Sequence, residues 1–182
     1  MEASIVLSVN NFVSQSQFLS WLIWFFATYF VGLIFFILFW FIVFAADKKQ
    51  ELKLAFYVLL SAAMARGVTE IIRFFYHKPR PFEVIGGINK LFSEFSPAFP
   101  SGHATFFFAF ATAVFLYHRK LGMIFFAMAL INSLARVASG VHWPSDVLAG
   151  AAVGIITALI LFKAFEKIRS KFERRLKAID KN

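Results

Sequence analysis

Long apolar runs separated by short polar breaks dominate this chain. Five of them are rich in Phe, Leu, Ile, Val and Ala. They lie at about Leu19–Ala46, Leu52–Tyr76, Pro100–His118, Leu121–Val141 and Val147–Phe165. A helix of roughly 20 apolar residues is long enough to cross the hydrocarbon core of a bilayer. The pattern therefore predicts an all-α, polytopic membrane helical bundle with about five transmembrane helices.

The lengths and spacing of these runs predict further local features. The third and fifth runs are short for a full crossing, as expected if their outer ends open onto a recessed polar pocket. Only the turn around 119–122 separates the third run from the fourth, which predicts an antiparallel hairpin. Residues 4–18 place Ile5, Val9 and Phe12 on one helical face. That segment is either an N-terminal interfacial helix or the start of a long first span.

Composition indicates a chain that lies in lipid. The 182 residues are 60% hydrophobic and include 27 phenylalanines, more apolar surface than a soluble domain of this size can bury. No charged residue stands between Glu2 and Asp47, and this stretch lacks the basic start and cleavage site of a signal peptide. The length fits a single integral membrane domain over 1–182. Because the chain has no cysteine, disulfides, thiolate metal sites and a cysteine nucleophile are excluded.

The net charge of +9 is concentrated beside the apolar runs. Lys and Arg gather at 48–53, at 119–120 and in the tail 163–182. Such clusters are typical of cytoplasmic anchors that face anionic lipid headgroups, and they argue against nucleic acid as a partner. If they are cytoplasmic, the amino terminus lies outside, and the ends of the second and fourth runs face outward.

Three short polar strings stand at these outward ends. In chain order they are Arg73-x6-Arg80-Pro81, Pro100-Ser101-Gly102-His103 and Arg136-x5-His142-x3-Asp146. Charge is costly inside a bilayer and tends to mark a functional site. Guanidinium groups match phosphate oxygens with paired donors, and imidazole can attack phosphorus or deliver a proton. Together the strings predict a site that holds phosphate with arginine and cleaves it with histidine.

Each string also has an interpretation of its own. Ser101 and Gly102 suit the start of a helix, whose free N–H groups favour an anion, and His103 follows as a candidate proton donor. Asp146 lies four residues after His142 and can hold one imidazole nitrogen while the other attacks. Taken singly, the strings also fit snorkelling arginines, a helix cap and an ordinary histidine–carboxylate pair.

The order and spacing of the three strings resemble the signature of the type 2 phosphatidic acid phosphatase superfamily. That signature is a basic residue-x6-Arg-Pro, then Pro-Ser-Gly-His, then Ser-Arg-x5-His-x3-Asp. The resemblance covers 73–146 and implies phosphatase activity without a metal or another cofactor. It makes His142 the nucleophile that forms a phosphohistidine, Asp146 the residue that orients it, and His103 the general acid. It also implies that the phosphoryl oxygens are held by Arg73, Arg80, Ser101, Gly102 and Arg136.

Two positions depart from the signature, and three other charged residues lie near it. Arg73 stands where the pattern usually has Lys and keeps the charge, whereas Ala135 replaces Ser and removes a hydroxyl. Arg66, Glu70 and Arg73 share one face of the second run at i, i+4 and i+7. Glu70 is therefore expected to neutralise Arg66 or to brace Arg73. Lys78 is either a contact for the substrate headgroup or a solvated loop residue.

Within the superfamily, the short chain and the compact connection 76–99 resemble bacterial undecaprenyl pyrophosphate phosphatases. The expected activity is release of phosphate from this carrier lipid at the outer face of the plasma or inner membrane. Phosphatidylglycerophosphate, phosphatidic acid and lipid A phosphate are alternative substrates, because the strings recognise phosphate rather than the rest of a lipid. A non-catalytic membrane protein that binds phospholipid headgroups is the alternative of another class. The sequence gives no indication of oligomeric state.

Overall fold

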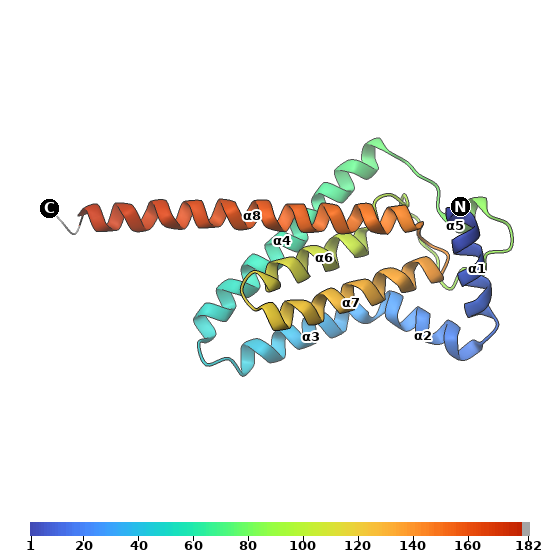
Figure 1. Cartoon of the computed structure of the whole chain (residues 1–182), viewed down its shortest axis with the longest axis horizontal. Helices are drawn as coiled ribbons and strands as arrows, with labels where there is room; N and C mark the ends of the chain where they lie inside the picture. The colour runs from blue at the N-terminus through green and yellow to red at the C-terminus, as the bar shows by residue number, and fades with distance from the viewer. Residues whose placement is uncertain (180–182) are drawn as a thin grey trace.

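The structure, a computed structural model, describes residues 1–179 as a bundle of helices (Figure 1). This part of the chain forms eight helices and no strand, which confirms the all-α prediction. The helices are α1 Glu2–Ser14, α2 Gln17–Thr28, α3 Phe30–Val43, α4 Lys48–Phe75, α5 Pro81–Val84, α6 Gly102–Phe115, α7 Arg119–Ala138 and α8 Pro144–Ile179.

Each predicted apolar run is helical in the structure. By length and composition, α4, α7 and Pro144–Lys171 of α8 can each cross a membrane. α2 and α3 together form a fourth candidate span, although a bend of 53° at Tyr29 divides it. α6 is apolar but has only 14 residues, which confirms that the third run is short for a crossing. The result is a multi-pass bundle with one short apolar helix.

The fifth run is not short, and on this point the prediction is wrong. α8 has 36 residues and continues past the apolar segment, so that it projects from the bundle in Figure 1. The residues after Phe165 are rich in Lys, Arg and Glu, which are good helix formers and extend the helix beyond the apolar part. The predicted basic tail 163–182 is therefore helical as far as Ile179, and residues 180–182 lie outside the described part.

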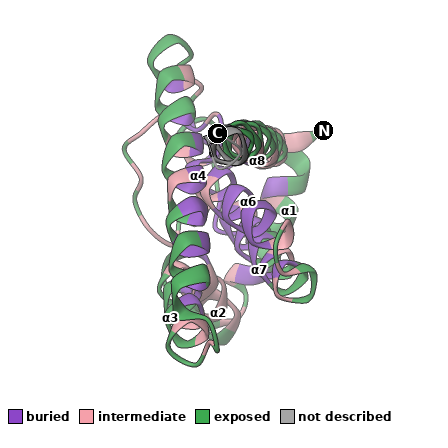
Figure 2. Cartoon of the chain, turned by 90° about the vertical axis from the view of Figure 1, so that its left-hand side faces the viewer, coloured by how far each residue is buried: buried purple, intermediate pink, exposed green. Residues whose placement is uncertain are grey.

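α6 forms the centre of the bundle. In Figure 2 it is enclosed by its neighbours and is coloured largely as buried. Phe107, Phe110 and Val114 have no exposed surface, and they belong to one apolar cluster with Val58 of α4 and Phe125 of α7. Because lipid tails are as apolar as these side chains, close packing rather than removal from water favours this arrangement. The packing fixes the start of α6 against the surrounding helices.

Two glycines bring α8 into close contact with α6. A Cβ atom on Gly150 would lie 2.6 Å from the carbonyl oxygen of Ser101. A Cβ atom on Gly154 would lie 2.8 Å from the backbone nitrogen of Ala109. Small residues four positions apart let two membrane helices approach at backbone distance. The same approach lets the N–H of Ser101 donate to the carbonyl oxygen of Asp146 at 2.9 Å, which joins the second polar string to the third.

Alternating helix directions gather the three strings at one end of the bundle. α4 and α7 run toward the end where α1 and α5 lie, and α6 and α8 begin there (Figure 1). α6 and α7 form the predicted antiparallel hairpin, joined by residues 116–118. The basic clusters at 48–53 and 119–120 lie at the opposite end. The predicted separation of the strings from the basic clusters is therefore confirmed.

α1 is a separate helix that packs against the bundle at the end that carries the strings. It ends at Ser14, and α2 begins after Ser16, whose hydroxyl accepts the N–H of Leu19 at 3.4 Å. One continuous first span is therefore not formed. The side-chain amide of Asn10 is buried and donates to the carbonyl oxygen of Ala138 at 3.0 Å, which ties α1 to the end of α7.

Candidate active site

The predicted site residues reach a common region from different elements. Two of them lie in the last turns of helices, four lie at helix starts, and two lie in connections. They are Arg73 in the last turn of α4, Arg80 before α5, Ser101, Gly102 and His103 at the start of α6, Arg136 in the last turn of α7, His142 before α8 and Asp146 in its first turn. The arginines and His142 are almost completely buried.

Ser96 joins the first two arginines. Its hydroxyl oxygen accepts from Arg73 Nη1 at 3.3 Å and from Arg80 Nη2 at 3.1 Å. Arg73 also donates through Nε and Nη2 to the carbonyl oxygen of Pro100, at 3.2 and 3.0 Å. Arg80 donates to the carbonyl oxygens of Ser96 and Val141, both at 2.8 Å. The two guanidinium groups therefore hold the 76–99 connection against the starts of α6 and α8.

His142 presents one ring nitrogen to the arginines. Its Nε2 lies 3.4 Å from Arg80 Nη1 and 3.5 Å from Arg136 Nη2. A guanidinium group offers only donors, so this nitrogen carries a lone pair. Burial, together with the positive charges of Arg136, Arg80 and Arg73, holds the pKa of His142 well below its usual value. The imidazole is therefore neutral near pH 7, as a nucleophile has to be.

Asp146 lies behind the other ring nitrogen. Its Oδ2 accepts from the backbone N–H of Trp143 at 2.9 Å and is 3.5 Å from His142 Nδ1. Its Oδ1 accepts from Lys78 Nζ at 2.8 Å. Lys78 also donates to the Ser145 hydroxyl at 2.8 Å, so it braces the carboxylate instead of being a free loop residue. The carboxylate can therefore stabilise an imidazolium, while a cation opposite it holds it in place.

Glu94 is a site residue that the sequence analysis did not identify. Its Oε1 accepts from Arg136 Nη2, and its Oε2 lies 3.6 Å from Arg80 Nη2. Burial raises the pKa of Glu94, but the two arginines outweigh this effect and hold the pKa below its usual value. Burial likewise lowers the pKa of Arg80 to about 10, which leaves it charged at neutral pH. The carboxylate therefore occupies the kind of position that a phosphate oxygen would take between two guanidinium groups.

The start of α6 faces the same region. The Ser101 hydroxyl accepts the N–H of Ala104 at 3.4 Å and caps the helix. Gly102 packs against the guanidinium group of Arg66, which occupies the space of any side chain at this position. His103 lies within electrostatic reach of Arg136, Glu94 and His142. This helix start can therefore bring backbone donors and a second imidazole to a bound anion.

Glu70 links two arginines on α4, as their spacing predicts. Its Oε1 lies 2.7 Å from Arg66 Nη2 and 3.3 Å from Arg73 Nη1. Glu70 and Arg66 are about half exposed, whereas Arg73 is buried. The carboxylate of Glu70 therefore holds the buried guanidinium group of Arg73 from its exposed side. Arg66 in turn fills the space beside Gly102 at the start of α6.

Two buried nitrogens in this region have unused hydrogen-bonding capacity. Among the residues that the structure describes, Arg136 Nε and His142 Nδ1 have no hydrogen-bond partner. A buried guanidinium N–H without an acceptor is costly, so a polar ligand is expected near it. The described residues contain no group of three or more His, Cys, Asp or Glu side chains that could hold a metal ion. The chemistry that this arrangement supports is binding of a phosphoryl group and attack on it by imidazole.

Comparisons with known proteins identify the family of this chain. The model of the PAP2 superfamily matches residues 54–170, which contain all three strings. The bacitracin transport permease protein BcrC of Bacillus licheniformis is 28% identical over 162 residues, covering 88% of this chain and 78% of that protein. The undecaprenyl-diphosphatase BcrC of Bacillus subtilis (strain 168) is 28% identical over 123 residues, covering 67% of this chain and 63% of that protein.

The arrangement of helices is also similar to that of a solved structure. The crystal structure of Aquifex aeolicus LpxE superposes with a TM-score of 0.70 at 27% identity, covering 88% of this chain and 93% of that chain. The family match covers more than half of the chain. It includes most of α4, all of α5, α6 and α7, and nearly all of the part of α8 that can cross a membrane. The chain therefore belongs to the PAP2 superfamily and is a multi-pass membrane lipid phosphatase.

Proposed function

We propose that this protein releases phosphate from undecaprenyl pyrophosphate through a phosphohistidine on His142. The observation that carries the proposal is the neutral Nε2 of His142, which faces the guanidinium groups of Arg80 and Arg136 at 3.4 and 3.5 Å. Asp146 lies behind the same ring. This combination of nucleophile, orienting carboxylate and anion-binding groups goes beyond what a headgroup-binding protein requires.

In the first step the terminal phosphoryl group lies among Arg73, Arg80 and Arg136. The lone pair on Nε2 of His142 attacks phosphorus, and the bond from phosphorus to the bridging oxygen breaks. His103 donates its proton to that oxygen as the lipid phosphate leaves. The imidazole becomes a cation, which the carboxylate of Asp146 stabilises from a distance of 3.5 Å between Oδ2 and Nδ1. The guanidinium groups balance the charge on the three equatorial oxygens.

The second step removes the phosphoryl group from the enzyme. Neutral His103 accepts a proton from water, whose oxygen attacks phosphorus while the bond from phosphorus to Nε2 of His142 breaks. Inorganic phosphate then leaves, and both histidines return to their starting protonation states. The net reaction consumes one water and splits one phosphoanhydride bond. Since Glu94 stands between Arg80 and Arg136, it has to give way before phosphate can bind both.

Two observations support the choice of substrate and side. The relatives named above include an undecaprenyl-diphosphatase of Bacillus subtilis. The basic clusters at 48–53 and 119–120 lie at the end of the bundle opposite the strings, as expected if those clusters are cytoplasmic. The site then faces outward from the plasma or inner membrane. Residues 1–182 act as one integral membrane domain in this proposal.

The test is phosphate release from undecaprenyl pyrophosphate in detergent with excess chelator. Phosphatidylglycerophosphate, phosphatidic acid and lipid A phosphate are assayed beside it. His142→Ala is expected to abolish release, and His118→Ala, at the opposite end of the bundle, is expected to leave it unchanged. Preference for one of the other lipids would keep the chemistry and overturn the substrate. Wild-type release by His142→Ala would overturn the mechanism.

A further inference from the structure

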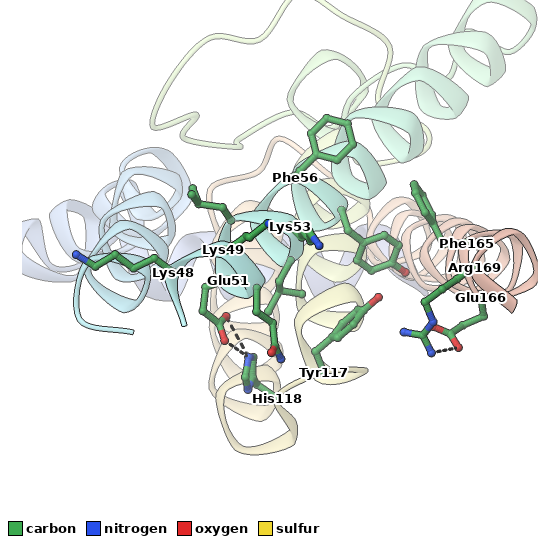
Figure 3. A pocket seen from close by; sticks show the side chains of 14 residues that line it. Lys48, Lys49, Glu51, Lys53, Phe56, Tyr117, His118, Phe165, Glu166 and Arg169 are labelled. Atoms are coloured by element: carbon green, nitrogen blue, oxygen red, sulfur yellow. Dashed lines mark hydrogen bonds and ion pairs between the residues drawn. The ribbon is translucent and has the colours of Figure 1, made fainter. Parts of the chain in front are cut away.

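A cavity lies at the end of the bundle opposite the candidate active site. Its volume is about 1090 Å³, and it is open to the outside. The first turns of α4, the connection between α6 and α7, and the outer half of α8 form its walls (Figure 3). The mechanism proposed above uses none of its lining residues.

The rim of this cavity is positively charged. Lys48, Lys49 and Lys53, referred to here as the lysine rim, are exposed on the first turns of α4. The acidic groups in the lining already have partners (Figure 3). Glu51 contacts His118 Nε2 with both carboxylate oxygens, at 3.2 and 3.1 Å. Glu166 forms an ion pair with Arg169 at 2.8 Å. The charge of the lysine rim is thus available to an anionic ligand.

The inner wall of the cavity is aromatic. The ring of Tyr57 lies 5.5 Å from that of Tyr117 and 5.5 Å from that of Phe165. The hydroxyl of Tyr57 is satisfied by the carbonyl oxygen of Ala158 at 2.9 Å, so Tyr57 presents its ring to the cavity rather than a free hydroxyl. Phe56 adds a further exposed ring. Such a wall suits hydrocarbon, so the cavity as a whole suits an anionic amphiphile.

The position of the cavity identifies the amphiphile. The start of α4 and the start of α7 bound it, and both are ends of candidate membrane spans. The cavity therefore lies at a bilayer surface, in the leaflet opposite the one that the candidate active site faces. A phospholipid is the anionic amphiphile available there, and each lysine near a membrane surface adds to its attraction.

We propose that this cavity binds an anionic phospholipid, with the headgroup phosphate on the lysine rim and the acyl chains against the aromatic wall. A site of 1090 Å³ is far larger than a single phosphate needs, and its lining is mostly hydrocarbon and aromatic carbon beneath the charged rim. Headgroup and chains therefore bind together. Because this site is remote from the strings, the proposal stands or fails independently of the proposed catalytic function.

The test uses the purified full chain in a non-ionic detergent and native mass spectrometry of bound lipid. The probe is dioctanoyl phosphatidylglycerol, a phosphodiester that offers no terminal phosphate to the active site. Lys48→Gln/Lys49→Gln/Lys53→Gln removes the lysine rim. Lys163→Gln/Lys167→Gln/Lys171→Gln is the matched control, because these exposed lysines lie outside the cavity lining and the loss of charge is the same. Phosphatase activity of both variants at the distant site verifies their folding.

Loss of the lysine rim is expected to weaken binding by about tenfold or more, whereas the control variant stays within about twofold of the wild type. The zwitterionic dioctanoyl phosphatidylcholine is expected to bind far more weakly. Deacylated phosphatidylglycerol is expected not to compete. Equal loss in both triple variants would mean general attraction to the basic surface and would overturn the site. Equal binding of the zwitterionic lipid, or competition by the deacylated headgroup, would also overturn it.

Discussion

Burial and the surrounding arginines, more than the carboxylate of Asp146, determine the protonation state of His142. Asp146 Oδ2 is 3.5 Å from His142 Nδ1, longer than a normal hydrogen bond, and Lys78 neutralises much of its charge at 2.8 Å. The other ring nitrogen, Nε2, lies beside the guanidinium groups of Arg80 and Arg136. The arginines therefore disfavour a positive ring in the free site. In the proposed mechanism, a bound anionic phosphate offsets the arginines and allows the ring to become positive.

The pH dependence should reflect the low pKa of His142. In the proposed mechanism the ring reacts when it is neutral, so activity is expected above the pKa of His142 and should be lost as the pH falls through it. Because burial and the arginines lower that pKa, the acid limb of kcat/KM should have its midpoint below about 6.5, the usual value for histidine. Burial and the charge of Arg136 lower the pKa of His103 to about 3 in the free protein, so an alkaline limb is expected in kcat, where bound phosphate offsets the arginine, and not in kcat/KM. A pH profile of phosphate release in detergent measures the acid limb of kcat/KM, and an acid midpoint at or above about 6.5 would contradict the assignment.

Glu94 should act as a competing anion within the phosphate site. Glu94→Gln keeps the shape of the side chain but removes the charge that occupies Arg136 and Arg80. Hydrogen bonds to charged groups contribute about 1.5–3 kcal/mol, so inhibition by inorganic phosphate is expected to strengthen about tenfold. The KM for lipid phosphate should fall as well. Steady-state kinetics with added phosphate measure both effects.

Glu83→Gln is the matched control for Glu94→Gln. Glu83 lies on the same connection, and its carboxylate accepts the backbone N–H of Arg80 at 2.7 Å. It forms no ion pair with the guanidinium group of Arg80 in the described structure. The same loss of charge there should leave phosphate inhibition within about twofold of the wild type, since Glu83 is the weakest of the charges that act on the Arg80 side chain and Glu94 is the strongest. A higher KM in Glu94→Gln would instead mean that Glu94 positions Arg136.

At the scale of helices, the contact between α6 and α8 positions the second string against the third. Gly150→Ala places a methyl group 2.6 Å from the carbonyl oxygen of Ser101. Forcing extra carbon into a packed contact costs about 1–3 kcal/mol. We therefore expect a lower thermal midpoint in detergent and a loss of activity, because the hydrogen bond from Ser101 to Asp146 depends on this approach.

The control for this substitution is Gly67→Ala on α4. A Cβ atom at Gly67 has no neighbour within 4 Å, and alanine favours a helix over glycine by about 1 kcal/mol. The control should keep its activity, and its thermal midpoint should stay the same or rise. If Gly150→Ala behaved in the same way, the close contact would not be what holds the two strings together.

The helices and the strings could be predicted from sequence because each has a regular pattern. Apolar runs give helices, and fixed spacings place Glu70 between Arg66 and Arg73. The contacts of Glu94 and Ser96 with the arginines of the site could not be predicted. Both residues lie in the irregular connection 76–99, and no regular spacing relates them to the strings. The break at Tyr29 was also hidden, because it interrupts the backbone without interrupting the apolar run.

The whole molecule separates two kinds of positive charge. Buried arginines lie at the end with the strings, and exposed lysines lie at the end with the cavity. Buried arginines are costly in an apolar bundle and call for an anion, whereas exposed lysines suit lipid headgroups. If both proposals hold, the bundle binds phosphate groups in both leaflets and cleaves only one of them, because the histidines of the strings lie at one end.

The orientation of the bundle gives a final prediction. Because the chain has no cysteine, single cysteines can report which side of the membrane each end faces. Phe95→Cys places a thiol at a position that is 98% exposed in the connection beside the candidate active site. Lys120→Cys places one at the opposite end, on the exposed start of α7. The charge distribution predicts that the first end is outside and the second is cytoplasmic.

The measurement is labelling by a membrane-impermeant maleimide in intact cells or spheroplasts, and then after permeabilisation. Phe95→Cys should react in both conditions, and Lys120→Cys only after permeabilisation. Phosphatase activity of each variant verifies that the fold is intact, and the cysteine-free wild type gives the background. The reverse pattern would place the site in the cytoplasm and remove the argument for an outward-facing carrier-lipid phosphatase. It would leave the phosphoryl-transfer chemistry intact, since the arginine and histidine geometry does not depend on which side of the membrane it faces.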